Sequence, residues 1–238
     1  MDPVPRIWGS GWSQHTFQED VSVSSAAIRP ATPKDTPFLA WAILTATRSH
    51  LPRGWFDIAL DLPEKACLEF LNCLTTTESL SQWHYSRFLI AESHGCPIAT
   101  LCAFRARDAY PAWTAALMET LKAQQISPVE AESIWRRGAY MFKCTMRPDD
   151  DWWVIENLAT LPEYRGRGYT AELLSHAIET GRVEGSTHAQ VSLFIGNDRA
   201  ERAYVRAGFQ LVKERRDSHF EAVSGASGLR QYIRGLRS

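Results

Sequence analysis

Residues 152–171, WWVIENLATLPEYRGRGYTA, constrain the fold of this chain most strongly. The first half, up to Thr160, is rich in aromatic and β-branched residues, which is typical of a buried strand. Pro162 cannot donate to a sheet ladder, so the strand should end before it. From Thr170 the apolar residues recur at helical spacing, which predicts a helix that runs to about Gly185. The sequence therefore predicts a strand, a tight turn and a helix in direct succession.

The turn contains two glycines, Gly166 and Gly168, whose backbone can come close to a ligand because they lack a Cβ atom. A glycine turn that leads into a helix presents free N–H groups at the positive end of the helix dipole, which suits a phosphate group. Residues 166–171 match the dinucleotide-binding pattern G-x-G-x-x-A, and residues 165–170 nearly match R/Q-x-x-G-x-G/A. A dinucleotide-binding domain should continue as a run of βαβ units, whereas only one strand-helix-strand unit follows here.

Composition narrows the class of protein. The 238 residues are 45% hydrophobic and 22% charged, as in a globular protein with one large domain or two small ones. The net charge of −1 creates no field that would recruit nucleic acid or an anionic membrane. No apolar run approaches the roughly 20 residues that a membrane-spanning helix needs. We therefore expect neither nucleic acid nor a membrane as a partner.

Two further features concern the cellular setting. The first residues, MDPVPRIWGSGWSQ, have neither the basic start nor the apolar core of a signal peptide. The five cysteines are odd in number and have no CxxC spacing, which favours reduced thiols over disulfides or a zinc site. We expect a cytoplasmic protein without a metal.

Taken in order, residues 1–24 are expected to form an N-terminal arm, and residues 25–238 a single domain. Strands are expected at 26–30, 87–92, 97–104, 152–160, 189–195 and 209–214, and helices at 33–49, 63–74, 115–125, 128–141, 170–185 and 197–208. Residues 50–62 are expected to be a loop, and residues 219–238 a strand or loop followed by a basic helix. An antiparallel hairpin followed by a strand-helix-strand unit predicts a mixed α/β sheet.

Residues 108–148 are predicted to form a helical insertion between the third and fourth strands of the hairpin-containing sheet. Five of its residues are aromatic, namely Tyr110, Trp113, Trp135, Tyr140 and Phe142. Two interpretations remain open: these side chains pack the insertion on the sheet, or they line a pocket.

Over about residues 25–216, this order of elements resembles the GNAT superfamily of N-acetyltransferases. Three stretches carry the resemblance: IENLATLPEYRGRGYT at 155–170, NDRAERAYVRAGF at 197–209, and IRPATPKD at 28–35. The resemblance implies the GNAT acyl-CoA N-acyltransferase fold, a central mixed sheet flanked by helices. Thr170 departs from the family pattern, which usually has Gly or Ala there. The insertion at 108–148 is absent from the minimal fold, so the resemblance does not imply an acceptor.

The resemblance implies acetyl-CoA as co-substrate. In the family, backbone amides of the loop after the fourth strand bind the CoA pyrophosphate, and that strand pairs with the pantetheine arm. Carried over to this sequence, the expected cofactor-binding residues are Leu158, Ala159, Thr160, Arg165, Gly166, Arg167, Gly168, Tyr169, Thr170 and Asn197.

The expected chemistry starts from the acceptor amine, which must lose a proton before it attacks a thioester. The position of Glu156 resembles that of the general base of spermidine-type acetyltransferases; a salt bridge is the alternative role for this carboxylate. Tyr204 stands where the family places the general acid that protonates the departing thiolate. Its alternative role is that of a core tyrosine with a satisfied hydroxyl. Asp150 and Asp151 are the next candidates for the base.

The sequence thus predicts an N-acetyltransferase that works by direct transfer in a ternary complex, with a small-molecule amine or a peptide amine as acceptor. A GNAT-fold sensor that binds acyl-CoA without turnover is one alternative, and a dinucleotide-binding oxidoreductase is another. The acceptor, the length of the acyl group and the oligomeric state, including a homodimer, stay open.

Overall fold

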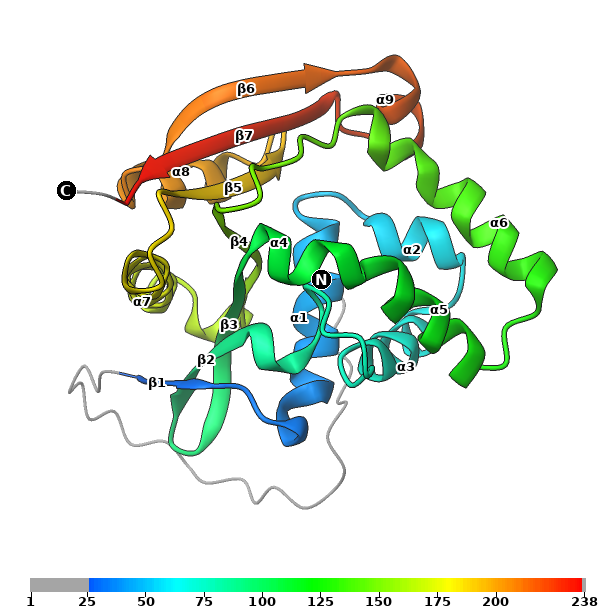
Figure 1. The fold of residues 1–238 in the computed structure, drawn as a ribbon, viewed down its shortest axis with the longest axis horizontal. Helices are drawn as coiled ribbons and strands as arrows, with labels where there is room; N and C mark the ends of the chain where they lie inside the picture. The colour runs from blue at the N-terminus through cyan, green and yellow to red at the C-terminus, as the bar shows by residue number, and fades with distance from the viewer. Residues whose placement is uncertain (1–25, 237–238) are drawn as a thin grey trace.

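The computed structural model describes residues 26–236, so the expected arm at 1–24 lies outside the described residues. A seven-stranded sheet with the order β1-β2-β3-β4-β5-β7-β6 forms its centre (Figure 1). The strands are β1 (Ala27–Pro30), β2 (Phe88–Ser93), β3 (Cys96–Arg105), β4 (Trp153–Thr160), β5 (His188–Phe194), β6 (Gln210–Arg216) and β7 (Gly228–Gly235). Only β4 and β5 are parallel neighbours; all other described pairs are antiparallel. The predicted mixed sheet is confirmed.

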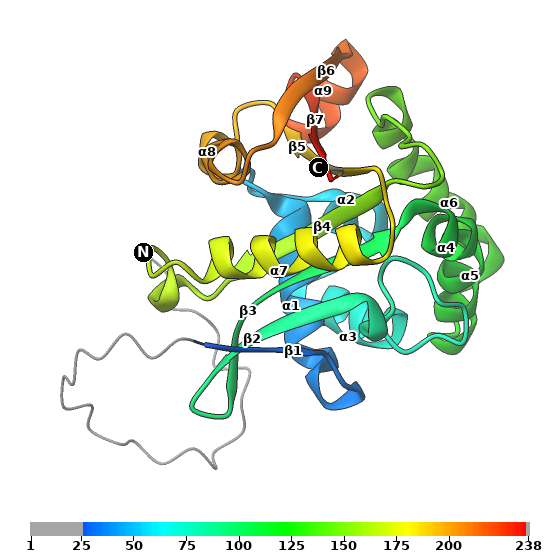
Figure 2. The ribbon, with the colours of Figure 1, turned by 60° about the vertical axis from the view of Figure 1, so that its left-hand side comes forward.

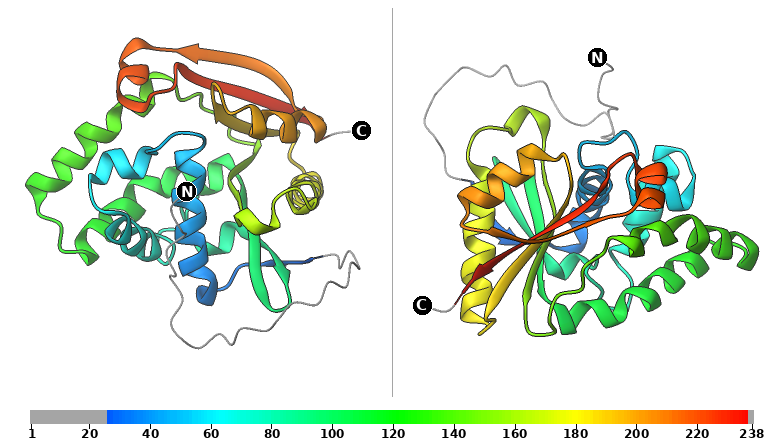
Figure 3. Two further views of the ribbon diagram at one scale, coloured as in Figure 1. Left: turned by 180° about the vertical axis from the view of Figure 1, so that it is seen from behind. Right: turned by 90° about the horizontal axis from the view of Figure 1, so that it is seen from above.

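Helices cover both faces of this sheet. They are α1 (Thr36–Arg48), α2 (Trp55–Leu60), α3 (Glu64–Leu74), α4 (Ala106–Ala109), α5 (Trp113–Ala123), α6 (Pro128–Gly138), α7 (Tyr169–Val183), α8 (Asp198–Arg206) and α9 (Ser218–Ser224). Figure 3 shows α7 and α8 on one side of the sheet and α1 with α2 on the other. Figure 2 shows α7 crossing in front of β3 and β4. No helix within residues 26–236 is long and apolar enough to span a bilayer.

The two faces of the sheet bury separate cores because successive residues of a strand point to opposite sides. On β4, Val154 belongs to the core under α1 and α3, while its neighbour Ile155 belongs to the core under α7. Leu173 and Ala177 of α7 are fully buried against the second core, as their spacing in the sequence predicted. β4 therefore lies at the centre of the molecule, with a helix layer on each side.

The predicted insertion is confirmed, since α4, α5 and α6 lie between β3 and β4. α6 and the short 3₁₀ turn after it lie against α2 and α9, and α5 lies against α3. The insertion therefore extends the helix layer that contains α1 and α3.

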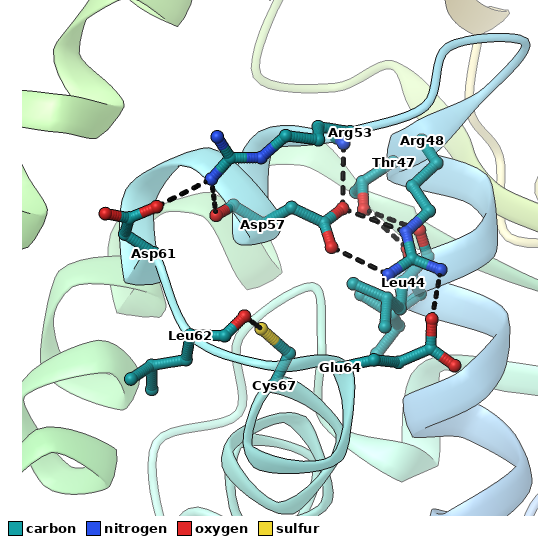
Figure 4. Close-up of polar contacts among 11 residues, drawn as sticks. Leu44, Thr47, Arg48, Arg53, Asp57, Asp61, Leu62, Glu64 and Cys67 are labelled. Atoms are coloured by element: carbon teal, nitrogen blue, oxygen red, sulfur yellow. Dashed lines mark hydrogen bonds and ion pairs between the residues drawn. The ribbon is translucent and has the colours of Figure 1, made fainter.

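The expectation of a loop at residues 50–62 is wrong, because α2 lies there. Arg48 at the end of α1 forms two hydrogen bonds to Asp57, at 2.9 and 2.7 Å, and a third to Glu64 at 2.7 Å (Figure 4). Asp57 also accepts the backbone N–H of Gly54 at 2.8 Å and so caps the helix. This six-residue helix depends on an ion pair with another helix, which no local pattern reveals.

The expectation of a basic helix near the C-terminus is also wrong. Residues 218–224 form α9, and β7 then inserts between β5 and β6. The basic residues of this segment contact neighbouring elements. Arg230 forms ion pairs with Glu201 and Glu214 at 2.9 and 2.7 Å. Arg234 donates to the backbone oxygen of Ala207. The charges that suggested an exposed helix are thus satisfied by neighbouring elements.

Candidate active site

The sheet opens between β4 and β5. These strands pair only at Trp153 with Ala189 and at Val154 with Gln190, and they separate beyond those residues. On its other side β4 contains a bulge, because the register with β3 shifts between the residue pairs on either side of Asn157. Asn157 has a φ of 52°, a left-handed conformation that is uncommon for residues other than glycine. A bulge bends its strand, so the end of β4 turns away and leaves space beside β5.

This space is a cleft of about 1170 Å³ between α7 and α8, with the ends of β4 and α1 as its base. Nine of the ten residues predicted to bind the cofactor line it: Leu158, Ala159, Thr160, Arg165, Gly166, Gly168, Tyr169, Thr170 and Asn197. The tenth, Arg167, does not line it; its guanidinium lies 5.4 Å from the ring centroid of Tyr164. The structure therefore brings nearly the whole predicted set together.

The glycine turn lies at one part of this cleft and has an unusual backbone. Gly166 and Gly168 have φ values of 80° and 94°, and a Cβ atom at either would meet no atom within 4 Å. Arg165 is the last residue before the turn whose N–H is bonded to the backbone, and Ala171 is the next. Within residues 26–236, the five amides at 166–170 thus have no acceptor. Together they can donate to an anion.

Arginine side chains make the cleft positive. Arg165 and Arg234 line it, together with three arginines of α8, Arg199, Arg202 and Arg206. No ion pair within residues 26–236 involves the three of α8 or Arg165, and Glu179, the carboxylate that lines the cleft, already pairs with Arg182. Burial lowers the pKa of Arg165, and the nearby charge of Arg199 lowers it further. A group of cations with this little compensation favours a ligand with several negative charges.

Sequence reasoning missed the arginines of α8. Arg199, Arg202 and Arg206 follow each other at spacings of three and four residues, which places them on one face of the helix. That spacing is a signal in the sequence, but the face on which it lies depends on how α8 packs. Ala200 and Ala203 also line the cleft, and their small side chains keep it open.

Asn197 joins two walls of the cleft. Its side-chain oxygen accepts the N–H of Ala200 at 3.1 Å and so caps α8. Its amide donates to the hydroxyl of Ser49 at the end of α1, at 2.6 Å.

Thr170, the residue that departs from the family pattern, has its hydroxyl 3.3 Å from that of Thr160. This contact links the end of β4 to the start of α7.

Glu156 is half-buried on β4, two residues before Leu158, which lines the cleft. Its Oε1 accepts a hydrogen bond of 2.6 Å from the hydroxyl of Tyr110 in the insertion. Within the described residues it has no ion pair, so the alternative role in a salt bridge finds no partner there. Burial raises the pKa of Glu156 above its usual value, although the hydrogen bond from Tyr110 opposes that shift. A carboxylate in this state is a stronger base than one in water.

Tyr204 lies on α8, 6% exposed, with its ring 6.0 Å from that of Phe209. Its hydroxyl forms no hydrogen bond with residues 26–236, unlike that of a satisfied core tyrosine. Burial raises the pKa of Tyr204, and the charge of Glu156 raises it further, so the phenol keeps its proton at neutral pH. Tyr204 belongs to the core under α7, whereas Glu156 shares the opposite face of β4 with Val154. The two side chains therefore approach from opposite faces of the sheet.

The other candidates for the base are less suitable. Asp150 and Asp151 are both exposed, and they form ion pairs with Arg147 and Arg107, respectively.

Cys102 is fully buried beside Glu156, and burial together with that carboxylate raises the pKa of its thiol. These surroundings do not activate Cys102 as a nucleophile.

The structure thus combines a positive cleft with a split mixed sheet, and neither Glu156 nor Tyr204 is among the residues that line this cleft. The sequence model of the acetyltransferase (GNAT) family matches residues 57–209. The chain belongs to this family, as the motifs of the turn and of α8 predicted.

Solved structures with the same fold include several acetyltransferases. A crystal structure described as an acetyltransferase is 19% identical, with a TM-score of 0.65 over 89% of this chain and 100% of that chain. An N-acetyltransferase from Staphylococcus aureus Mu50 is also 19% identical, with a TM-score of 0.65 over 88% of this chain and 100% of that chain. An agmatine N-acetyltransferase is 16% identical, with a TM-score of 0.52 over 89% and 100%. No curated protein sequence matches the chain.

Proposed function

We propose that this protein is an N-acetyltransferase that moves the acetyl group of acetyl-CoA to an amine by direct transfer in a ternary complex. The observation that carries the proposal is the run of five amides at 166–170 that have no acceptor within residues 26–236, which opens on a cleft lined by arginines without an ion pair in that same range. Such a site suits a ligand with several phosphate groups. Membership of the GNAT family supports acetyl transfer as the reaction.

The residues of the cleft fit CoA. The amides of the turn would hold the pyrophosphate, and the arginines of α8 add charge for the remaining phosphate. Leu158, Ala159 and Thr160 lie where β4 has left β5, so this part of β4 would hold the pantetheine arm. When bound, acetyl-CoA supplies a thioester as the acyl donor. The donor site is thus formed by the opening of the sheet.

Glu156 is the general base in this proposal. An acceptor amine enters as an ammonium ion and transfers one proton to the carboxylate, after which its lone pair is free to attack. The raised pKa of Glu156 brings its basicity closer to neutral pH, where general bases work best. The positive charges of the cleft lie with the donor, so this carboxylate is the group that favours a cationic acceptor.

Tyr204 is the general acid in this proposal. Its hydroxyl carries a proton and has no acceptor within the described residues, so it is free to donate to the departing sulfur. The raised pKa of the phenol makes it a weaker acid than a tyrosine in water. Its contribution is therefore to hydrogen-bond the growing charge on sulfur rather than to ionise beforehand.

The acceptor class in this proposal is the primary amine of a small molecule or a peptide. All five cysteines are free thiols, which supports a reducing, cytoplasmic setting. A GNAT-fold sensor would bind acyl-CoA in the same cleft without turnover.

Counting free thiol separates an enzyme from a sensor. The full chain is incubated with excess acetyl-CoA and a panel of primary amines, and the thiol released per protein molecule is measured. The proposal predicts many thiols per protein with at least one amine. Saturable CoA binding with at most one thiol per protein across the whole panel would favour the sensor instead.

A further inference from the structure

The insertion makes a side-chain hydrogen bond with β4, from the hydroxyl of Tyr110 to Glu156. Tyr110 begins the 3₁₀ turn Tyr110–Ala112 directly after α4. Its ring meets Phe104 of β3 edge-on, with centroids 5.2 Å apart and planes at 85°. The ring is therefore held by packing, and the hydroxyl is aimed at a fixed point.

The carboxylate of Glu156 lies within hydrogen-bonding distance of that hydroxyl. It pairs in register with Cys102 on β3, and Phe104 lies two residues further along the same face of β3. Tyr110 packs against the core on this face. The 2.6 Å contact therefore joins the insertion to β4 across a strand and 46 residues of sequence.

Few other groups act on this carboxylate. Three titratable side chains lie close enough for the charge of Glu156 to raise their pKa, namely Tyr110 from the insertion, Cys102 from β3 and Tyr204 from α8. Tyr110 alone donates a hydrogen bond to it within residues 26–236. The hydrogen bond occupies Oε1 and leaves Oε2 without a donor in that part of the chain.

We propose that Tyr110 is a positioning residue for Glu156, whose hydroxyl holds Oε1 and thereby turns Oε2 toward the acceptor amine. This inference rests on the proposed function. The acceptor N–H bond breaks, the proton moves to Oε2, and the electron pair stays on nitrogen. Tyr110 keeps its own proton throughout. The insertion thus supplies part of the catalytic arrangement rather than only packing.

A second buried tyrosine of the insertion provides a matched control. Tyr140 is 2% exposed, and its ring packs 5.4 Å from that of Phe220. Its hydroxyl has no hydrogen-bond partner in the described part of the chain. Tyr140→Phe therefore removes the same atom from a similar environment without touching Glu156.

The test is the titration of the Glu156 carboxyl in the free protein, followed by NMR with ¹³C-labelled glutamate. The signal is assigned by its loss in Glu156→Gln. In Tyr110→Phe we expect the pKa of Glu156 to rise by about one unit, because a hydrogen bond to the charged form is lost. The acid limb of the plot of kcat against pH should move to higher pH by the same amount, and kcat at pH 7 should fall about tenfold. Tyr140→Phe should change neither.

An unchanged Glu156 titration in Tyr110→Phe would overturn the inference even if turnover falls. If the Glu156 titration shifts in Tyr110→Phe but the wild-type protein turns over no amine, the contact is supported and acetyl transfer is contradicted. The failure of the inference and the failure of the proposed function are therefore distinct. If Tyr110→Phe does not fold, the reciprocal measurement uses Glu156→Gln. Loss of the carboxylate charge should lower the pKa of Tyr110, and an unchanged Tyr110 would overturn the inference.

Discussion

The side-chain amide of Asn197 donates to the hydroxyl of Ser49 at 2.6 Å, and this contact joins the start of α8 to the end of α1. Ser49 has a φ of 60°, a strained conformation for a serine. Because Ser49 and Asn197 both line the cleft, the contact fixes the distance between two of its walls. We infer that it also helps to position the arginines of α8, the helix that Asn197 caps.

Asn197 therefore has two roles that substitutions can separate. Ser49→Ala removes the acceptor of the Asn197 amide but leaves the cap on Ala200 intact, so stability should change little while CoA affinity falls severalfold. Asn197→Ala loses both contacts and should destabilise the fold by about 1–2 kcal/mol. Thermal melting and calorimetry with CoA measure the two effects. Equal CoA affinity in wild type and both variants would show that the bridge does not shape the site.

Gly168 tests the anion site. Gly168→Val forces a branched side chain into a φ of 94° and fills the space in front of the turn. We expect CoA affinity to fall at least tenfold, which corresponds to about 1.4 kcal/mol. Gly185→Val is the control, because Gly185 has a φ of 80° and open space but lies at the other end of α7. Both variants should melt lower, and only the first should lose CoA binding; equal losses would mean that strain alone is responsible.

Glu156→Gln tests the base. The amide keeps its size and still accepts from Tyr110, but it takes up no proton, so we expect kcat to fall about 10²-fold with little change in CoA affinity. The loss should shrink at high pH, where more of the acceptor is already neutral. Wild-type kcat in this variant at pH 7 would place the base elsewhere.

The same variant makes a prediction about stability. The folded-state pKa of Glu156 is raised, so its protonated form stabilises the fold below the unfolded pKa, and that contribution is lost as pH rises through the folded value. Glu156→Gln carries no buried charge and should melt higher than wild type at pH 8, with the difference closing near pH 4. A variant that melts lower than wild type at pH 8 would show that the carboxylate stabilises the fold.

Tyr204→Phe tests the acid. Since the hydroxyl has no partner within residues 26–236, the melting temperature should hardly change, while kcat should fall about 10- to 10³-fold. Tyr232→Phe is the control, because the hydroxyl of Tyr232 donates to Glu201. It should lower stability without lowering turnover. A Tyr204→Phe protein that melts several degrees lower and turns over normally would make Tyr204 a structural residue.

Local patterns in the sequence predicted the sheet, the insertion and the turn. Gly166 and Gly168 predicted the tight turn that lines the cleft because their conformation is a local property of the chain. The contact of Tyr110 with Glu156 was not predictable, since it depends on how the insertion packs against β3 and β4. The same holds for α2, which the Arg48–Asp57 ion pair supports. Interactions between distant segments leave no periodicity in either segment.

β7 shows a second limit. The sequence predicts a strand or loop followed by a basic helix over residues 219–238, whereas the burial of β7 comes from its place between β5 and β6. Arg230 forms ion pairs with residues of α8 and β6, and Arg234 donates to the backbone at the end of α8. Their charges therefore do not mark a solvent-exposed face. A strand placed by its neighbours is recognised only once those neighbours are assembled.

The most direct test of the account is to follow an isotopically labelled acetyl group. The full chain is mixed with labelled acetyl-CoA and a pool of primary amines and peptides, and the products are examined by mass spectrometry, with Glu156→Gln in parallel. The account predicts label on an amine, none on the protein, and strongly reduced product in Glu156→Gln. Label that accumulates on a cysteine, or CoA that binds while every amine stays unlabelled, would contradict it.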